Sequence, residues 1–232
     1  MSCLRVHAYM SNQFNILSWS SEIPLCDDVW LGMQARNIAM VDLSIIRPME
    51  ADALAAYMKR EKTPLEHLLP LSALSQMWSF SLYEFLRTWR QRAKELLELA
   101  DAYNAAAPGE QKAHLDAAVE KAKERDRFAS LVPSSFSEHV AQIADVSFMR
   151  SLRGYYEWTE PLFREAEVLR VTLAKHEVPK TKGMFAEAPG YGRMSYRDGS
   201  IYWFINLKDG SSIKVDRREL ANTFLGIEDD EV

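Results

Sequence analysis

One long stretch with a helical pattern constrains this chain more than any other feature, and it runs from residue 71 to the Pro108-Gly109 pair. Apolar residues recur there every three or four positions: Leu74, Trp78, Leu82, Phe85, Trp89, Leu96, Ala100 and Tyr103. Such spacing places them on one stripe of an α-helix. A helix of about 34 residues is about 50 Å long, which is too long for a compact α/β unit. The stretch therefore predicts the spine of a helical bundle that stops at Pro108-Gly109.

Proline positions divide the rest of the first 178 residues into further helices. We expect a helical segment from about residue 27 to 60 that is ended or kinked at Pro48, and a connection that contains Pro64 and Pro70. A charged helix is expected from Glu110 to about Phe128, and another from an N-cap at Ser135 or Ser137. The helical pattern continues to about residue 177, and we expect Pro161 to interrupt it.

The period of the pattern changes after Pro179 and Gly183. Asp-Gly pairs at 198–199 and 209–210 lie between β-rich segments, which predicts a meander of three short strands. Asp216 is then expected to cap a short terminal helix, with Glu219 as its capping-box partner. The predicted fold is mainly α: an antiparallel multi-helix bundle with a small C-terminal three-stranded β-meander and a terminal helix. Residues 1–178 form the bundle domain, and residues 179–232 pack on it.

Composition agrees with a helical domain of the cytosol. The chain is 47% hydrophobic and has 9 Gly and 9 Pro among 232 residues, so it can bury a sizeable core and has few turns. Two cysteines, Cys3 and Cys26, suit a reducing compartment. The N-terminus has no apolar core of a signal peptide, and no run of about 18 apolar residues occurs. We expect a cytoplasmic protein without a membrane segment.

Most strong catalytic motifs are absent from the sequence. It contains no GxxxxGK[ST], no GxGxxG after a strand, no GxSxG and no HExxH. No His follows a Glu at the Glu-x-x-His spacing that di-iron bundles use. Two cysteines are too few for a zinc cluster, and Cys3, His7 and Cys26 would lack a fourth ligand. We therefore expect no metal and no cofactor.

The stretch RVTLAKH, residues 170–176, ends the last long predicted helix of the bundle. Together with the bundle architecture, it resembles the HEPN superfamily, in which an Arg and a His are separated by four to six residues. The resemblance covers roughly residues 24–178. It implies a metal-independent ribonuclease in which His176 moves protons and Arg170 stabilises charge on the phosphate, in a site that a second subunit usually completes. The alternative is an ordinary helix end, where Lys175 and His176 favour the C-terminal dipole.

Three other groups have a structural and a functional interpretation. Arg87, Arg90, Arg92 and Lys94 on the spine form either a salt-bridge network with nearby glutamates or a phosphate contact. Tyr155, Tyr156, Trp158 and Phe163 are either core residues or stacking platforms for bases. The segment after residue 178 is either a linker or an anion site. In the latter case Lys180, Lys182, Arg193 and Arg197 would bind RNA.

Two functions follow from these observations. The lack of catalytic motifs favours a non-catalytic interaction or scaffold module, and the long aromatic-rich helices indicate self-association, most simply a homo-oligomer, or a protein partner. The alternative is a HEPN-like endoribonuclease or RNA-binding protein of a bacterial toxin or phage-defence type. The net charge of −5 provides no global attraction to RNA. However, residues 164–218 contain eleven Lys or Arg against seven Asp or Glu.

Overall fold

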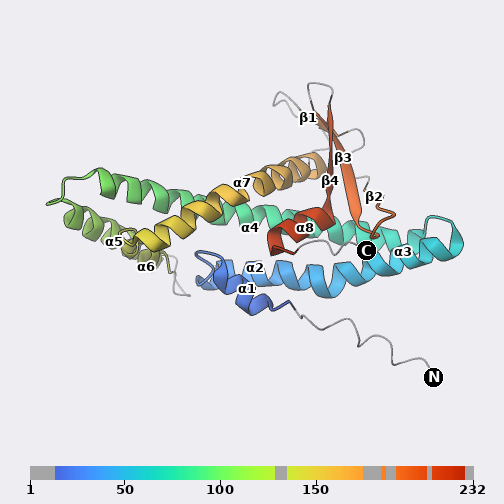
Figure 1. The fold of residues 1–232 in the computed structure, drawn as a ribbon, viewed down its shortest axis with the longest axis horizontal. Coiled ribbons are helices and arrows are strands. Elements are labelled where there is room, and N and C mark those ends of the chain that lie inside the picture. The colour runs from blue at the N-terminus through green and yellow to red at the C-terminus, as the bar shows by residue number, and fades with distance from the viewer. Residues whose placement is uncertain (1–13, 129–134, 175–183, 187–191, 208–210, 228–232) are drawn as a thin grey trace.

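A computed structural model describes residues 14–128, 135–174, 184–186, 192–207 and 211–227. Helices form an elongated antiparallel bundle, and a small sheet with a terminal helix packs against one end of it (Figure 1). The helical elements are α1 (Ile16–Glu22), α2 (Val29–Val41), a π-helical turn η1 (Asp42–Ile46), α3 (Arg47–Arg60), α4 (Leu65–Ala105), α5 (Gln111–Phe128), α6 (Phe136–Ala141), α7 (Val146–Ala174) and α8 (Arg217–Leu225). The strands are β1 (Met184–Ala186), β2 (Arg193–Met194), β3 (Ile201–Leu207) and β4 (Ser212–Asp216). The predicted fold class is confirmed.

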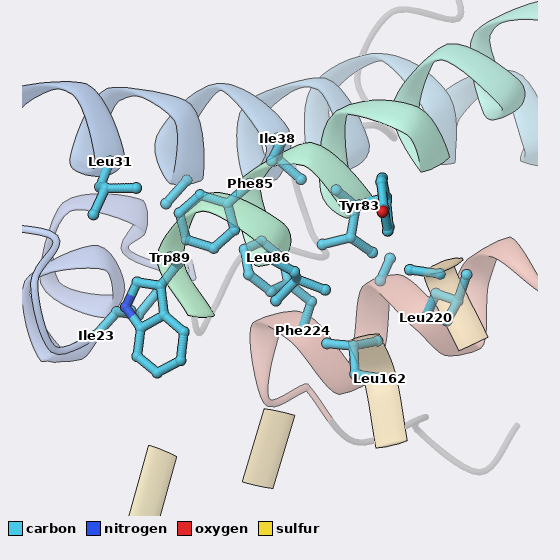
Figure 2. Close-up of a cluster of buried hydrophobic side chains, with 14 of the residues drawn as sticks. Ile23, Leu31, Ile38, Tyr83, Phe85, Leu86, Trp89, Leu162, Leu220 and Phe224 are labelled. Atoms are coloured by element: carbon cyan, nitrogen blue, oxygen red, sulfur yellow. The ribbon is translucent and has the colours of Figure 1, made fainter. Parts of the chain in front are cut away.

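The spine of the bundle is α4, whose 41 residues make it about 60 Å long at 1.5 Å per residue. Its predicted stripe is buried from Trp78 to Ala100, and the ring of Phe85 meets that of Phe224 from α8 at 5.5 Å. Figure 2 shows this cluster, in which Phe85 and Leu86 of α4 lie between α2 and α8, and Trp89 lies beside Ile23. Each buried tryptophan of the spine also satisfies its indole N–H: Trp78 donates to the Ile38 carbonyl at 3.0 Å and Trp89 to the Pro24 carbonyl at 2.6 Å.

Two of the proline predictions are wrong. Pro70 lies inside α4, five residues after its start, where its ring is exposed. The single hydrogen bond that its missing N–H removes is the one to the Glu66 carbonyl, which water can replace. Pro161 lies inside α7, which continues unbroken to Ala174. Arg90 of α4 supports that turn, since it donates hydrogen bonds to the Tyr156 carbonyl and the Thr159 hydroxyl at 2.6 and 2.8 Å.

Pro48 does not end the helix that contains it, but a π-helical turn lies just before it. The helical run passes from α2 through η1 into α3 without ending, and Pro48 lies in the first turn of α3. The π-helical turn ends two residues before the proline, and the Arg47 N–H donates to the carbonyl of Asp42, five residues back. A π-turn accommodates one extra residue and changes the helix phase locally. Both Asp42 and Ile46 are fully buried there.

The sheet is three strands wide. β3 is central and pairs antiparallel with β4 on one side, while β1 and β2 occupy opposite ends of its other side. Its inner face is buried and contains Met194, Ile201, Trp203, Ile205 and Val215. The turn at 198–199 is confirmed, and the one predicted at 209–210 lies outside the described residues.

Gly199 lets that turn approach α3. Its φ is +77°, and a Cβ there would lie 2.1 Å from the carbonyl oxygen of Glu50. Because only glycine tolerates both the conformation and the contact, this position fixes how the sheet is seated on the bundle.

Buried ion pairs attach α8 to the continuous helical run formed by α2, η1 and α3. The Arg217 guanidinium, fully buried, pairs with Asp42 and with Glu50, the latter at 2.6 Å. Arg218 also pairs with Glu50, and Arg47 bridges Asp42 at 2.8 Å and the Asn222 amide oxygen at 2.6 Å. The predicted N-cap is confirmed, because the Asp216 carboxylate accepts from the Arg218 N–H at 2.9 Å.

Candidate functional site

Arg170 lies in the last turns of α7, where it is half-buried. Its guanidinium stacks over the ring of Tyr83 from α4, 5.4 Å from the centroid. In the part of the chain that the structure describes, it forms no ion pair. His176 lies outside the described residues, so the juxtaposition of the two side chains stays a prediction.

The predicted RNA-binding residues divide in the same way. Lys180 and Lys182 lie outside the described residues, whereas Arg193 is on β2 and Arg197 is in the turn that follows it. Arg197 is engaged by carboxylates, with Asp198 at 3.3 Å and Glu219 at 4.0 Å. Arg193 is exposed, has no carboxylate partner among the described residues, and lies 5.5 Å from the ring centroid of Phe204.

A pocket of about 360 Å³ opens beside Arg193, where the end of α3 and the start of α4 meet the sheet. It is lined by Tyr57, Thr63, Leu68, Gly192, Arg193, Met194, Tyr196 and Tyr202. The rings of Tyr57 and Tyr196 are 4.8 Å apart, and the hydrogen bond between their hydroxyls raises the pKa of Tyr57. Sequence analysis did not single out these tyrosines. The available signal was the alternation in IYWFI, which separates Tyr202 and Phe204 from the buried Ile201, Trp203 and Ile205.

The apolar residues of α2 occupy two faces. Leu31, Ala35, Ile38 and Ala39 are buried in the bundle. The opposite face carries large apolar side chains that remain open to solvent, with exposed fractions of 56% for Val29, 48% for Trp30, 42% for Met33 and 51% for Met40. We call these four residues the α2 outer stripe. Beside it, a recess of about 370 Å³ lies between α2 and α4, lined by Gln34, Asn37, Ile38, Phe80, Ser81 and Glu84.

The positive cluster of the spine follows the salt-bridge interpretation. Arg87 pairs with Glu84 at 2.8 Å, and Lys94 lies 3.7 Å from Glu98. Arg92 reaches back to Asp28 at 2.8 Å. Arg90 is buried against Tyr156 and pairs with Glu160 of α7. Because each cation is neutralised within the bundle, the cluster has little charge left for a phosphate.

The predicted aromatic group on α7 is mainly structural. Tyr155, Tyr156 and Phe163 pack against the core, and Tyr155 meets Trp89 at 4.9 Å between ring centroids. Trp158 is the exception, since it is nearly half exposed. The core interpretation is therefore confirmed for Tyr155, Tyr156 and Phe163.

A thiol in the loop before α2, Cys26, and a histidine on α6, His139, are the residue types of a nucleophilic pair. Burial raises the pKa of Cys26 to about 12, so the thiol is protonated and a poor nucleophile. His139 is also buried, and its Nε2 lies 2.9 Å from an Asp27 oxygen. That contact lowers the pKa of Asp27. These groups connect α6 to the loop rather than activate a nucleophile.

Other site classes find no support in the described part of the chain. No three His, Cys, Asp or Glu side chains there come together as a metal site would require. None of the helices described is both long enough and apolar enough to cross a bilayer. No family model, curated protein or solved structure matches the chain.

Proposed function

We propose that the protein is a non-catalytic interaction module that self-associates through the α2 outer stripe. The observation that carries this proposal is the exposure of Val29, Trp30, Met33 and Met40 on one face of a helix whose other face is already buried. Large apolar side chains gathered in the open on one helical face mark interaction sites. The exposed Arg36 and Asn37 between Met33 and Met40 add polar groups to this face. A second copy of the chain is the simplest partner that presents a matching apolar surface.

The residue types suit an interface. Tryptophan dominates interface hot spots because it buries a large rigid surface, and methionine adapts its shape to a facing side chain. Positions 29, 33 and 40 are separated by four and seven residues, the spacing along one helical face. A two-fold axis across the stripe would place α2 of one copy against α2 of the other, each contributing the same residues.

The recess between α2 and α4 offers a cavity that a side chain of the second copy could fill in this interface. It lies directly beside the outer stripe, and its lining mixes an aromatic ring, Phe80, with the polar side chains of Gln34 and Asn37. A large side chain from the second copy can enter it and exchange hydrogen bonds at the rim. An apolar centre with a polar rim is the usual composition of protein interfaces.

Two lysine variants, compared by their oligomeric state in sedimentation velocity, test the proposal. Met40→Lys places a charge in the stripe, and we expect it to shift the protein to the monomer. Met58→Lys is the matched control, since Met58 is also exposed but lies on α3 outside the stripe. An unchanged oligomer in Met40→Lys, or equal dissociation in both variants, would contradict the proposal.

The second candidate function is the HEPN-like ribonuclease. What favours it is the position of Arg170, which is half-buried, fixed on Tyr83 and without an ion pair among the described residues. In that mechanism His176 takes the proton of the RNA 2′-hydroxyl and Arg170 stabilises the charge that builds on the phosphate. RNA cleavage in EDTA that disappears in His176→Ala would support it. A folded protein that leaves RNA intact would exclude it.

A further inference from the structure

The outer face of the sheet carries a row of aromatic rings. Because side chains alternate along a strand, Tyr202 and Phe204 point away from the buried Ile201, Trp203 and Ile205. Their centroids are 5.5 Å apart in an edge-to-face arrangement, and Phe204 is 39% exposed. Tyr196 continues this surface across the pocket and is 63% exposed.

Strand register places a cation beside each of the two strand aromatics. Arg193 pairs with Tyr202 across β2–β3, and Lys214 pairs with Phe204 across β3–β4. The Lys214 ammonium lies 4.7 Å above the Tyr202 ring, and the Arg193 guanidinium 5.5 Å from the Phe204 ring. Lys214 shares its charge with Asp216 at 3.1 Å, so Arg193 is the cation most available to a ligand.

We propose that this face, with the tyrosine-lined pocket, binds single-stranded nucleic acid. Unpaired bases would stack on Tyr196, Tyr202 and Phe204, and one would enter the pocket. Arg193 would contact a phosphate. Stacking platforms flanked by positive charge are the shared feature of proteins that bind single strands without reading their sequence. The pocket volume of about 360 Å³ lies at the lower end of the range for small-ligand sites.

The charges decide between this ligand and a proline-rich peptide. Aromatic grooves also bind polyproline segments, which are extended and need no phosphate contact. Here Arg193 and Lys214 lie 5.5 and 4.7 Å from the centroids of the Phe204 and Tyr202 rings, at the edge of the surface that bases would cover, and Arg193 has no carboxylate partner among the described residues. A polyanion with planar bases uses both features, whereas a proline-rich peptide uses the rings alone.

The inference goes beyond the proposed interaction module, and it gives the RNA-binding alternative a site that needs neither Arg170 nor His176. The net charge of −5 limits the attraction to local contacts, so we expect modest affinity. With the one phosphate contact at Arg193, the slope of log Kobs against log salt concentration should be about −0.7.

Fluorescence anisotropy with the full chain tests the site. The probes are labelled single-stranded RNA and single-stranded DNA of mixed sequence, their duplexes, and a proline-rich peptide. The site variants are Tyr196→Ala, Phe204→Ser and Arg193→Gln. Lys112→Gln, an exposed charge on α5, and Val146→Ser, an exposed apolar side chain at the start of α7, are the matched controls. Thermal melting of each variant verifies its folding. Because two variants each remove one ring, Tyr196→Ala and Phe204→Ser, the test stays valid if one of them is unfolded.

We expect single strands to bind more tightly than duplexes. Loss of one ring should weaken binding at least about fivefold, and Arg193→Gln should reduce the magnitude of the salt slope by about 0.7. Both controls should bind like wild type. Tighter binding of either single-stranded RNA or single-stranded DNA would support the proposal and identify the preferred nucleic acid. Equal binding of both would support a site that does not distinguish them.

Four results would overturn it. The first is no single-strand binding at about 100 µM, the weak end of non-specific affinities. The second is equal affinity for duplexes, and the third is binding that the site variants do not weaken. The fourth is binding of the proline-rich peptide alone, which would reassign the face. Trp30→Ala separates this site from the α2 interface, because it should lower the oligomeric mass without changing the dissociation constant for the single strand.

Discussion

Replacing Arg217 with methionine would leave two buried carboxylates without their principal partner. Arg217, Asp42 and Glu50 are all fully buried, and the guanidinium pairs with both acids. Removing one partner of a buried ion pair costs about 3–5 kcal/mol. Asp42 keeps Arg47 and Glu50 keeps Arg218, so we take the lower figure of about 3 kcal/mol. For a chain of this size each kcal/mol lowers Tm by about 2–4 °C. We therefore expect Arg217→Met to lower Tm by about 6–12 °C in a far-UV circular dichroism melt.

The effect should depend on pH in a defined direction. Burial raises the pKa of Glu50 above its ordinary value, against the lowering influence of Arg217 and Arg218. A carboxyl whose pKa is raised by folding stabilises the native state below its unfolded pKa, and this contribution is lost as pH rises through the folded pKa. Without Arg217 the folded pKa of Glu50 rises further. The destabilisation of Arg217→Met should accordingly be smaller at pH 5 than at pH 8.

Two variants make this test specific. Arg164→Met removes an arginine that is 74% exposed and pairs with Glu160, so it should cost less than about 1 kcal/mol. Combining Arg217→Met with Asp42→Asn and Glu50→Gln removes the three fully buried charges of the cluster and leaves the partly exposed Arg47 and Arg218. Most of the lost stability should therefore return. A loss below about 1 kcal/mol in Arg217→Met, or no recovery in the triple variant, would refute the reasoning about α8.

Two further predictions concern packing and titration. Gly199→Ala should destabilise the protein by more than about 1 kcal/mol, since φ is +77° and the new Cβ would meet the Glu50 carbonyl. Gly154→Ala, with open space around it in α7, should stabilise it by about 0.5–1 kcal/mol. Urea unfolding measures both, and equal effects would contradict the packing argument. The depressed pKa of Asp27 contributes stability above the ordinary carboxyl pKa of about 4, which is lost as pH falls through the folded value. Asp27→Asn should thus flatten the stability profile in this acid range, and an unchanged acid slope would remove the contact with His139 from the explanation.

The sequence predicts the spine and the strand region well because their patterns are long or sharply marked. The stripe from Leu74 to Tyr103 spans many turns, and the Asp-Gly pair at 198–199 has one common use between strands. Proline positions mislead because the cost of a proline depends on its surroundings. Pro70 is exposed near a helix start, and the turn that contains Pro161 is supported by Arg90 of α4.

The buried ion pairs could not be predicted from the local pattern. DRREL has the composition of a solvated helix start, and the partners of Arg217 lie 175 and 167 residues earlier, at Asp42 and Glu50. The two candidate surfaces were hidden for a related reason. Period alone places Trp30 and Met40 on a helix but does not say which face another helix covers. Tyr57 joins the sheet's aromatic surface only because the end of α3 meets Tyr196.

The molar mass of the wild-type chain in solution tests the central claim most directly. Light scattering after size-exclusion chromatography, over a range of loading concentrations, compares that mass with the 26.6 kDa of one chain. Self-association through the α2 outer stripe predicts an integral multiple of 26.6 kDa that falls toward one chain on dilution or in Met40→Lys. A mass of one chain at every concentration would contradict the account.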